Sequence, residues 1–319
     1  MRELIIKKND AGQRLDKFII KALDLPMSLL YKSIRLKKIK VNRKRAEAGL
    51  ILSEGDTVQC FLADSFFEKK EADDTLLRIT PKLSIIYEDE NILLVNKRPG
   101  ISVHEDEHGA QNTLITHILA YLAQKNEYEP EKEQSFTPSL CNRIDRNTGG
   151  IVIAAKNAEA LRVMNEKIKN REIDKFYLAA IHGIPKKSSD TLKGYLLKDE
   201  TTNTVKVFSK NPPKNAKNII TKYKIVAKKG DSALIEVELL TGRTHQIRAH
   251  MAYIGHPLIG DGKYGINKRD RERGYKYQAL YSYKLRFSFK GKPTALDYLN
   301  GKEFKIDKRD IYFTEEYFK

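Results

Sequence analysis

The sequence has little cysteine and no long apolar run, and these absences exclude several classes of protein. Two cysteines, Cys60 and Cys141, cannot build a disulfide framework or a zinc site of four thiolates. No stretch approaches the ~18 consecutive apolar residues of a membrane-spanning helix. The polar start from Met1 to Lys8 is unlike a signal peptide. We therefore expect a soluble, cytoplasmic protein without a membrane partner.

Acidic residues are also few relative to basic ones. The 59 Lys and Arg residues exceed the 42 Asp and Glu residues, so the formal net charge is +17. Such a chain repels itself, and a polyanionic partner removes that repulsion. Nucleic acid is the first candidate for the partner, and an anionic membrane is the second. A lysine-rich proteome would give the same charge, so the charge alone leaves these readings open.

The length of 319 residues suggests two or three domains, and residues 1–62 have the pattern of one. Apolar side chains recur at helical spacing from Arg14 until Pro26 ends the pattern. Ser28 then suits the N-cap position of a second helix. The predicted elements of this unit are helices at 14–23 and 29–36 and strands at 39–42 and 57–61.

A basic cluster lies between Tyr31 and Ala46, and no acidic residue interrupts it. On a helix-turn-strand frame these side chains would share one side and form a phosphate-binding face. The alternative is an ordinary solvated surface, which is what most charge runs are. The cluster consists of Lys32, Arg35, Lys37, Lys38, Lys40, Arg43, Lys44 and Arg45.

The same region resembles the small α/β RNA-binding domain named after ribosomal protein S-four. The resemblance rests on residues 14–18, on the basic second helix and on the strand 39–42. That domain usually has Gly just before the strand, where Lys37 stands here. Because Gly favours left-handed backbone angles after a helix, Lys37 suggests a different local turn on the same fold.

Residues 63–80 are charged and weakly patterned, and we interpret them as a linker to a second unit, 81–319. This unit has many predicted strands, few helices and no regular alternation, which indicates an α+β fold with a mainly antiparallel mixed sheet. Thr113 and Asn157 are predicted helix caps, and 127–134 is predicted to be a surface loop. The predicted strands are 83–87, 92–95, 151–155, 176–183, 218–226 and 234–240.

One candidate site lies in the segment from Asn142 to Gly150, which ends in Thr-Gly-Gly before an apolar strand. Asp145 stands there between Arg143 and Arg146, whose charges favour its ionised form. A charged carboxylate on a tight turn in a basic surface suits a nucleophile or a base. A salt-bridged turn without function would look the same in sequence.

Two further segments carry polar residues in suggestive places. Tyr177 lies in a predicted strand, where packing is a commoner role than chemistry. From Leu240 to Met251 a strand ends and a helix opens, with Thr244 as its expected N-cap. Such a polar helix start suits an RNA phosphate or a carboxylate. The turn 255–261 is interpreted as structural. The polar residues crowded into the helix start are Arg243, His245, Gln246 and Arg248.

The three segments, in this order, resemble the RluA family of pseudouridine synthases, and the front end resembles its RluC/RluD branch. The resemblance covers the whole chain. It implies that Asp145 is the essential aspartate, that Tyr177 packs beside the target base and that Arg248 pairs with the aspartate. It also implies that Arg143 enters the RNA stack as the base leaves it.

Two positions depart from the family pattern: Asn142 stands where His is usual, and Gly149 where Ser is usual. Neither is the catalytic carboxylate, so we expect them to affect the shape of the loop or its RNA contacts. No zinc site is expected at His245 and His250, because five residues separate them and no third ligand stands nearby.

The resemblance implies a monomeric isomerase that converts uridines of large-subunit ribosomal RNA to pseudouridine. It needs neither metal nor cofactor, since the reaction involves no redox or hydrolytic step. Transfer RNA is an alternative substrate. A non-catalytic ribosome-assembly factor and a metal-dependent nuclease are alternatives of other classes. Besides the amino-terminal basic residues, the predicted RNA-binding residues are Arg143, Arg146, Arg243 and His245.

Overall fold

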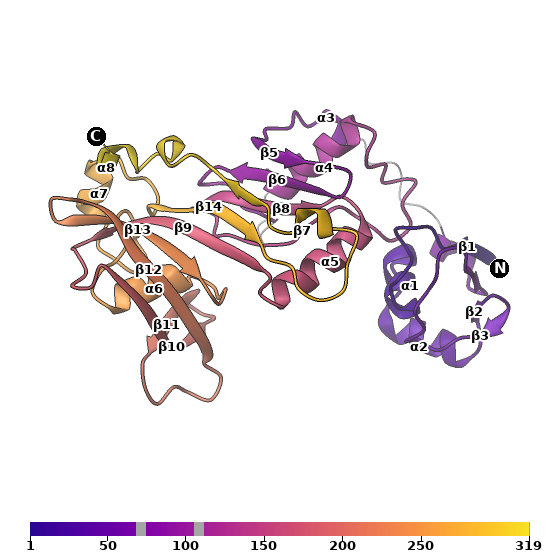
Figure 1. Cartoon of the computed structure of the whole chain (residues 1–319). Helices are drawn as coiled ribbons and strands as arrows, with labels where there is room; N and C mark the ends of the chain where they lie inside the picture. Colours follow the sequence, from indigo (N-terminus) through magenta and orange to yellow (C-terminus); the bar gives the residue numbers. More distant parts are fainter. Residues whose placement is uncertain (68–74, 105–111, 319) are drawn as a thin grey trace.

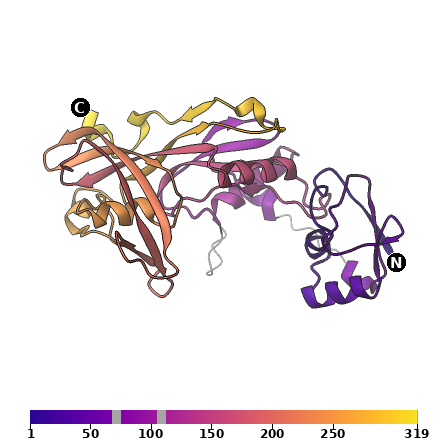
Figure 2. The same cartoon turned by 60° about the horizontal axis from the view of Figure 1, so that its bottom comes forward.

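The computed structural model describes residues 1–67, 75–104 and 112–318 (Figure 1). The molecule has a small amino-terminal part built on a four-stranded sheet and a large part built on an eleven-stranded sheet. Figures 1 and 2 place the two chain ends at opposite ends of an elongated shape. Within the described ranges, no helix is both long and apolar enough to cross a membrane.

In the amino-terminal part, two helices pack against an antiparallel sheet of order β1-β4-β2-β3. Leu15, Phe18 and Ile19 of the first helix are fully buried, as their helical spacing predicts. Phe67 joins the same core, so the beginning of the predicted linker is ordered. The elements are β1 (Arg2–Ile5), α1 (Leu15–Leu23), α2 (Met27–Arg35), β2 (Ile39–Val41), β3 (Lys44–Arg45), β4 (Thr57–Cys60) and a 3-10 turn, Asp64–Phe67.

Two local predictions for this part are wrong. Helix α2 begins at Met27 with Pro26 at its N-cap, because the fixed φ of proline suits a chain entering a helix. The turn after α2 is also the one that Gly would form at this position, and not a different one. Lys37 has a φ of 59°, which is the left-handed backbone angle that Gly would supply. Backbone bonds from Lys37 N to Ile34 O and from Lys38 N to Ser33 O hold it.

The large sheet has the order β11-β10-β12-β13-β9-β14-β8-β6-β5. All its pairings are antiparallel except that between β14 and β8, which confirms the α+β class and the mixed sheet. Strand β15 pairs with β14, and β7 pairs with β8. Its strands are β5 (Ile85–Glu88), β6 (Ile92–Lys97), β7 (Ser139–Leu140), β8 (Gly149–Ala155), β9 (Ile173–His182), β10 (Ser189–Asp199), β11 (Thr204–Phe208), β12 (Lys217–Lys229), β13 (Ser232–Leu239), β14 (Leu280–Phe287) and β15 (Glu303–Lys305).

Both faces of this sheet are covered. Along β8, Ile151 and Ile153 belong to one core, while Val152 and Ala154 belong to the other. The second core includes side chains of α4 and α6, together with Ile144 beside Asp145. The candidate catalytic segments therefore meet on the α4 and α6 face. The helices are α3 (Thr75–Arg78), α4 (Leu114–Gln124), α5 (Ala158–Lys169), α6 (Gln246–Tyr253), α7 (Lys268–Glu272) and α8 (Glu315–Phe318), with 3-10 turns at Asp297–Leu299 and Lys308–Asp310.

The helix caps of the large part were readable from sequence, but several strands were not. Thr113 accepts a hydrogen bond from Thr116 N, and Asn157 accepts one from Ala160 N, so both predicted caps are confirmed. Strands β10, β11 and β14 were missed. In β10 and β14 polar side chains interrupt the apolar ones, and β11 alternates polar and apolar residues over only five positions.

The predicted surface loop 127–134 has a structural role that its polarity concealed. Gln134 and the neighbouring Ser135 hydrogen-bond to the amino-terminal part at Ile5 and Asp10. The loop is therefore a contact between the two parts of the chain, in addition to the covalent connection.

Packing explains why Gly stands at position 149 instead of the usual Ser. A Cβ atom at Gly149 would overlap the ring of Tyr281, which is buried and donates a hydrogen bond from Oη to Asn96 Oδ1 at 2.7 Å. Gly149 and Tyr281 face each other across the parallel β8–β14 pair. Glycine at this position thus makes room for a tyrosine in the core.

We predict that Gly149→Ser lowers the free energy of unfolding by about 1–3 kcal/mol, the usual cost of overpacking a core. In a Tyr281→Ala background the same substitution should cost little, because the ring it meets is gone. Urea unfolding of the four proteins measures both effects. Equal costs in the two backgrounds would refute the packing explanation.

Candidate active site

Asp145 lies on the loop between β7 and β8, and its neighbour Asn142 anchors that loop. The Asn142 amide is buried; its Oδ1 accepts the Ile153 N–H at 2.7 Å, and its Nδ2 donates to Ile151 O at 3.4 Å. The Thr148 N–H donates to Asp145 O at 3.0 Å and closes the turn. Asn142 therefore fixes the loop to β8 and does not face an RNA.

Lys97 at the end of β6 holds the other side of the loop, and sequence reasoning missed it. Its side chain is buried, and Nζ donates to the carbonyls of Arg98, Ile101 and Arg146 at 3.2, 2.9 and 2.9 Å. Burial lowers the pKa of Lys97 to about 7, although the nearby charge of Asp145 acts in the opposite direction. A lysine at the end of a mainly apolar strand, just before a turn, was the available signal.

Arg248 on α6 joins two carboxylates. Its Nη1 donates to Asp145 Oδ2 at 3.0 Å, while Nε and Nη2 donate to Asp261 at 2.7 and 2.9 Å. The Arg248 and Asp261 side chains are almost fully buried, whereas the Asp145 side chain is 27% exposed. The guanidinium is thus held by a bidentate pair and presents its remaining edge to the accessible carboxylate.

Asp261 lies in the turn 255–261, which the sequence suggested to be structural, and the structure shows that it bonds Arg248. Burial alone would raise the pKa of Asp261, but hydrogen bonds and the charge of Arg248 hold it below its ordinary value. Backbone N–H groups of Lys263 and Tyr264 also donate to its Oδ1. The acidic residue six positions after Gly255 was visible, but nothing in sequence tied it to Arg248.

Helix α6 is fixed by polar groups on its buried side. Gln246 Oε1 accepts bonds from Thr241 Oγ1 and Arg243 N, and its Nε2 donates to Thr221 Oγ1. His250 hydrogen-bonds to the same Thr221, and burial lowers the pKa of His250 to about 4. These contacts pin the start of α6 to β12. Gln246 and His250 therefore fix the helix that carries Arg248.

The predicted cap at Thr244 is wrong, because α6 begins at Gln246 with His245 at its N-cap in a left-handed conformation, φ 52°. The side chain of His245 is largely buried, with only 10% of it exposed. Its Nδ1 is 2.8 Å from Tyr264 Oη, and its Nε2 is 3.8 Å from Asp145 Oδ2. Burial lowers the pKa of His245, while Asp145 opposes that shift.

Tyr177 on β9 belongs to the same apolar cluster as Ile144 and Ile247, which flank the motifs of Asp145 and Arg248. The residue is 6% exposed. Burial raises the pKa of its phenol to about 12, and the charge of Asp145 acts in the same direction. The three segments that the sequence singled out are therefore brought together, and their tyrosine stays neutral at physiological pH.

The arginines that flank Asp145 do not pair with it. Among the described residues, the side chains that approach its carboxylate with a nitrogen are Arg248, at 3.0 Å, and His245, at 3.8 Å. Arg143 and Arg146 are exposed, as is Arg243 across the site, and Arg146 Nε donates to Gly100 O at 3.1 Å. The ion pair of Asp145 is made by a residue of α6. Arg143 and Arg146 stand two and one positions from Asp145 in the chain, and their exposed charges are accessible to a substrate.

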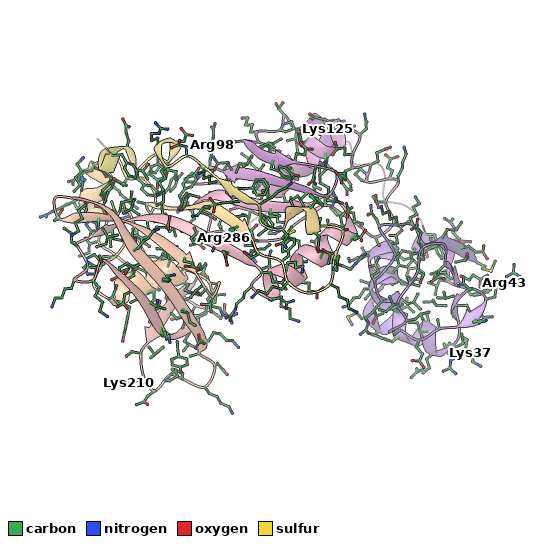
Figure 3. The ribbon with its side chains drawn as sticks, viewed as in Figure 1. Lys37, Arg43, Arg98, Lys125, Lys210 and Arg286 are labelled. Carbon is green, nitrogen blue, oxygen red and sulfur yellow. The ribbon has the colours of Figure 1, made fainter. Side chains whose placement is uncertain are left out.

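The amino-terminal basic residues form a second charged surface. Lys40 is half-buried, with Nζ 5.4 Å from the centre of the Phe61 ring, and the others are exposed. Figure 3 shows Lys37 and Arg43 on the outer side of the amino-terminal part. Their charges are therefore accessible to a partner. The exposed residues are Lys32, Arg35, Lys37, Lys38, Arg43, Lys44 and Arg45.

Metal chemistry would need a different cluster. In the described ranges, no three His, Cys, Asp or Glu side chains lie close enough together to hold a metal ion. The arrangement at Asp145 is instead that of one accessible carboxylate, an immobilised guanidinium and a buried phenol. Such a set can orient and stabilise charge on a polar substrate without a proton-relay chain.

The chain is similar to known proteins over most of its length. The family described as RNA pseudouridylate synthase matches residues 91–253, which include Asp145, Tyr177 and Arg248. Ribosomal large subunit pseudouridine synthase C of Vibrio parahaemolyticus is 36% identical over 275 residues, 84% of this chain and 82% of its own. An uncharacterised RNA pseudouridine synthase of Mycoplasma capricolum is 35% identical over 309 residues, 95% of this chain and 96% of its own.

A solved structure shares the fold. Human RNA pseudouridylate synthase domain containing 1 superposes with a TM-score of 0.57 at 24% identity, covering 72% of this chain and 84% of its own. The family assignment rests on the identities above and on the family match over half of the sequence. The chain belongs to the RNA pseudouridylate synthase family and is an RNA pseudouridine synthase, an isomerase.

Proposed function

We propose that this enzyme isomerises specific uridines of large-subunit ribosomal RNA and that Asp145 is its catalytic carboxylate. The observation that carries the catalytic assignment is the Arg248 guanidinium, which bonds Asp145 with one edge and buried Asp261 with the other. The substrate assignment is supported by relatives named as ribosomal large subunit pseudouridine synthases. The enzyme acts as a cytoplasmic monomer.

The reaction breaks the glycosidic bond of uridine, turns the uracil and reattaches it through carbon 5. The base cannot turn inside a stack, so the nucleotide must be flipped out at a cost of about a few kcal/mol. Arg143, which is exposed beside the site, fills the space the base leaves. Arg146 and Arg243 contact the flanking phosphates, which offsets part of that cost.

At the site itself, each residue has one task. Asp145 faces the nucleotide as a charged carboxylate, which both attack on the nucleotide and assisted elimination require. Arg248 orients that carboxylate through its 3.0 Å ion pair. Tyr177 packs its neutral ring against the uracil and keeps water from the reacting carbon. His245 Nε2 lies 3.8 Å from the same Asp145 oxygen, Oδ2, and limits the rotation of the carboxylate.

The same proposal divides the chain into three parts. Residues 1–62 form an S-four-like RNA-binding domain, 63–80 a linker and 81–319 the catalytic domain. The basic surface of the first domain holds RNA at a distance from the catalytic carboxylate, which suits a large folded RNA.

Asp145→Asn should abolish release of tritium from RNA labelled at uracil carbon 5. We expect a loss on the order of 10⁴-fold in rate, as for removal of a group on which a reaction depends. Asp174→Asn is a matched control, since Asp174 is 26% exposed and pairs with Arg286 away from the site. Wild-type rates in Asp145→Asn would exclude this residue, and no release by the wild type would exclude the reaction.

Arg248→Lys should lower kcat on the order of 10²-fold with little change in KM. Lysine keeps the charge but cannot form a bidentate pair with Asp261 while reaching Asp145. Arg286→Lys, at the exposed pair with Asp174, is the control and should leave kcat unchanged. Steady-state tritium release measures both constants, and an unchanged kcat in Arg248→Lys would show that the bridge is dispensable.

Arg43→Ala plus Lys44→Ala should weaken RNA binding and flatten its salt dependence, by about one unit in the slope for each phosphate that is no longer neutralised. Lys268→Ala plus Arg269→Ala removes the same charge from α7, toward the carboxyl-terminal end of the molecule (Figure 1). Affinity measured across a salt series should respond only to the first pair. Identical slopes for both variants would place the amino-terminal domain off the RNA path.

A further inference from the structure

A buried carboxylate links the two parts of the chain. Asp10 of the amino-terminal part is fully buried. Its Oδ1 accepts the Ser135 hydroxyl at 2.6 Å, and its Oδ2 accepts Gln134 Nε2 at 3.1 Å. Gln13 Nε2 donates to the same Ser135 oxygen at 2.7 Å, and Gln134 also donates to Ile5 O at 2.7 Å. All of these bonds cross from residues 1–13 to the loop before β7.

A second group of contacts lies beside the first. Asn9 donates to Glu133 Oε1 at 3.0 Å and accepts the Ala158 N–H at the start of α5. Arg162 on α5 donates to Ala11 O at 2.9 Å. Its guanidinium lies against Gly12, which has a φ of 74° and no side chain to obstruct the approach.

These contacts are directional and polar. The fully buried apolar side chains of each part belong to separate cores, and the junction described here consists of hydrogen bonds. A hydrogen bond weakens steeply when its angle is wrong, so such a junction favours one orientation. An unsatisfied buried carboxylate is costly, which adds to the preference for the docked arrangement. The junction therefore resists rotation more than a flexible connection would.

The orientation matters for an enzyme with two distant RNA-contacting surfaces. Lys37 and Arg43 lie at one end of the molecule (Figure 3), whereas Asp145 lies in the large part, on the loop between β7 and β8. An RNA that reaches both the basic surface and Asp145 must span a fixed distance. The enzyme can select an RNA by that distance only if the junction keeps the two parts of the chain in one orientation.

We propose that Asp10, Ser135 and Gln134 form a positioning lock that sets the span between the amino-terminal basic surface and the catalytic carboxylate, and so helps to select the uridine. This inference rests on the proposed RNA-binding role of the amino-terminal domain. The lock residues do not touch the substrate. Their effect is confined to RNAs long enough to contact both parts.

The test uses the full-length chain with Gln134→Ala plus Ser135→Ala, which empties the lock from the catalytic side and leaves residues 1–67 unaltered. The control makes the same two types of substitution at other positions, Gln124→Ala plus Ser139→Ala. The side chains of these residues hydrogen-bond to Ile79 O and Thr137 O. Small-angle X-ray scattering measures the radius of gyration. Tritium release is measured on a large-subunit ribosomal RNA transcript and on short hairpins from it.

The lock variant should have a larger radius of gyration than wild type and control. Its kcat/KM on the long transcript should fall by about tenfold or more, because a freed domain has a lower effective concentration at its site. Its kcat/KM on short hairpins should match wild type. An unchanged radius, an unchanged rate on the long transcript or an equal loss on hairpins would each overturn the proposal. Failure of the wild type to release tritium from any RNA would instead refute the proposed function.

Discussion

The site depends on one buried ion pair, between Arg248 and Asp261. Both side chains lie out of water, and removing one partner of such a pair costs about 3–5 kcal/mol. Because Asp261 takes two of its nitrogens, the guanidinium has one orientation and can offer Asp145 only one edge. Asp145 remains accessible while its partner does not. The fold thus holds the cation rigidly and leaves the reactive anion exposed to substrate.

The rest of the large sheet serves that pair. Strand β12 pins α6 through Thr221, and β6 and β8 anchor the Asp145 loop through Lys97 and Asn142. Three elements distant in sequence therefore meet at one carboxylate. All three anchors are buried polar groups, which a mainly apolar sheet can accommodate because they are hydrogen-bonded.

Sequence patterns predicted the class of fold and the two capped helices, and the family resemblance implied the convergence of Asp145, Tyr177 and Arg248. They could not predict Asp261, Lys97 or Asn142 as parts of the site, since each acts through a contact made by distant chain segments. Residues 127–134 show the same limit, because polarity marks a loop as exposed whether it meets water or another domain. Lys37 shows the converse, as a non-glycine residue occupies left-handed geometry where backbone bonds hold it.

The most direct test of this account is a double-mutant cycle on the rate of tritium release, combining Arg248→Lys with Asp261→Asn. If Arg248 acts only while Asp261 holds it, the two losses are strongly non-additive and the double variant is little worse than either single one. Losses that simply add would show that Asp261 and Arg248 act independently, which would contradict the account.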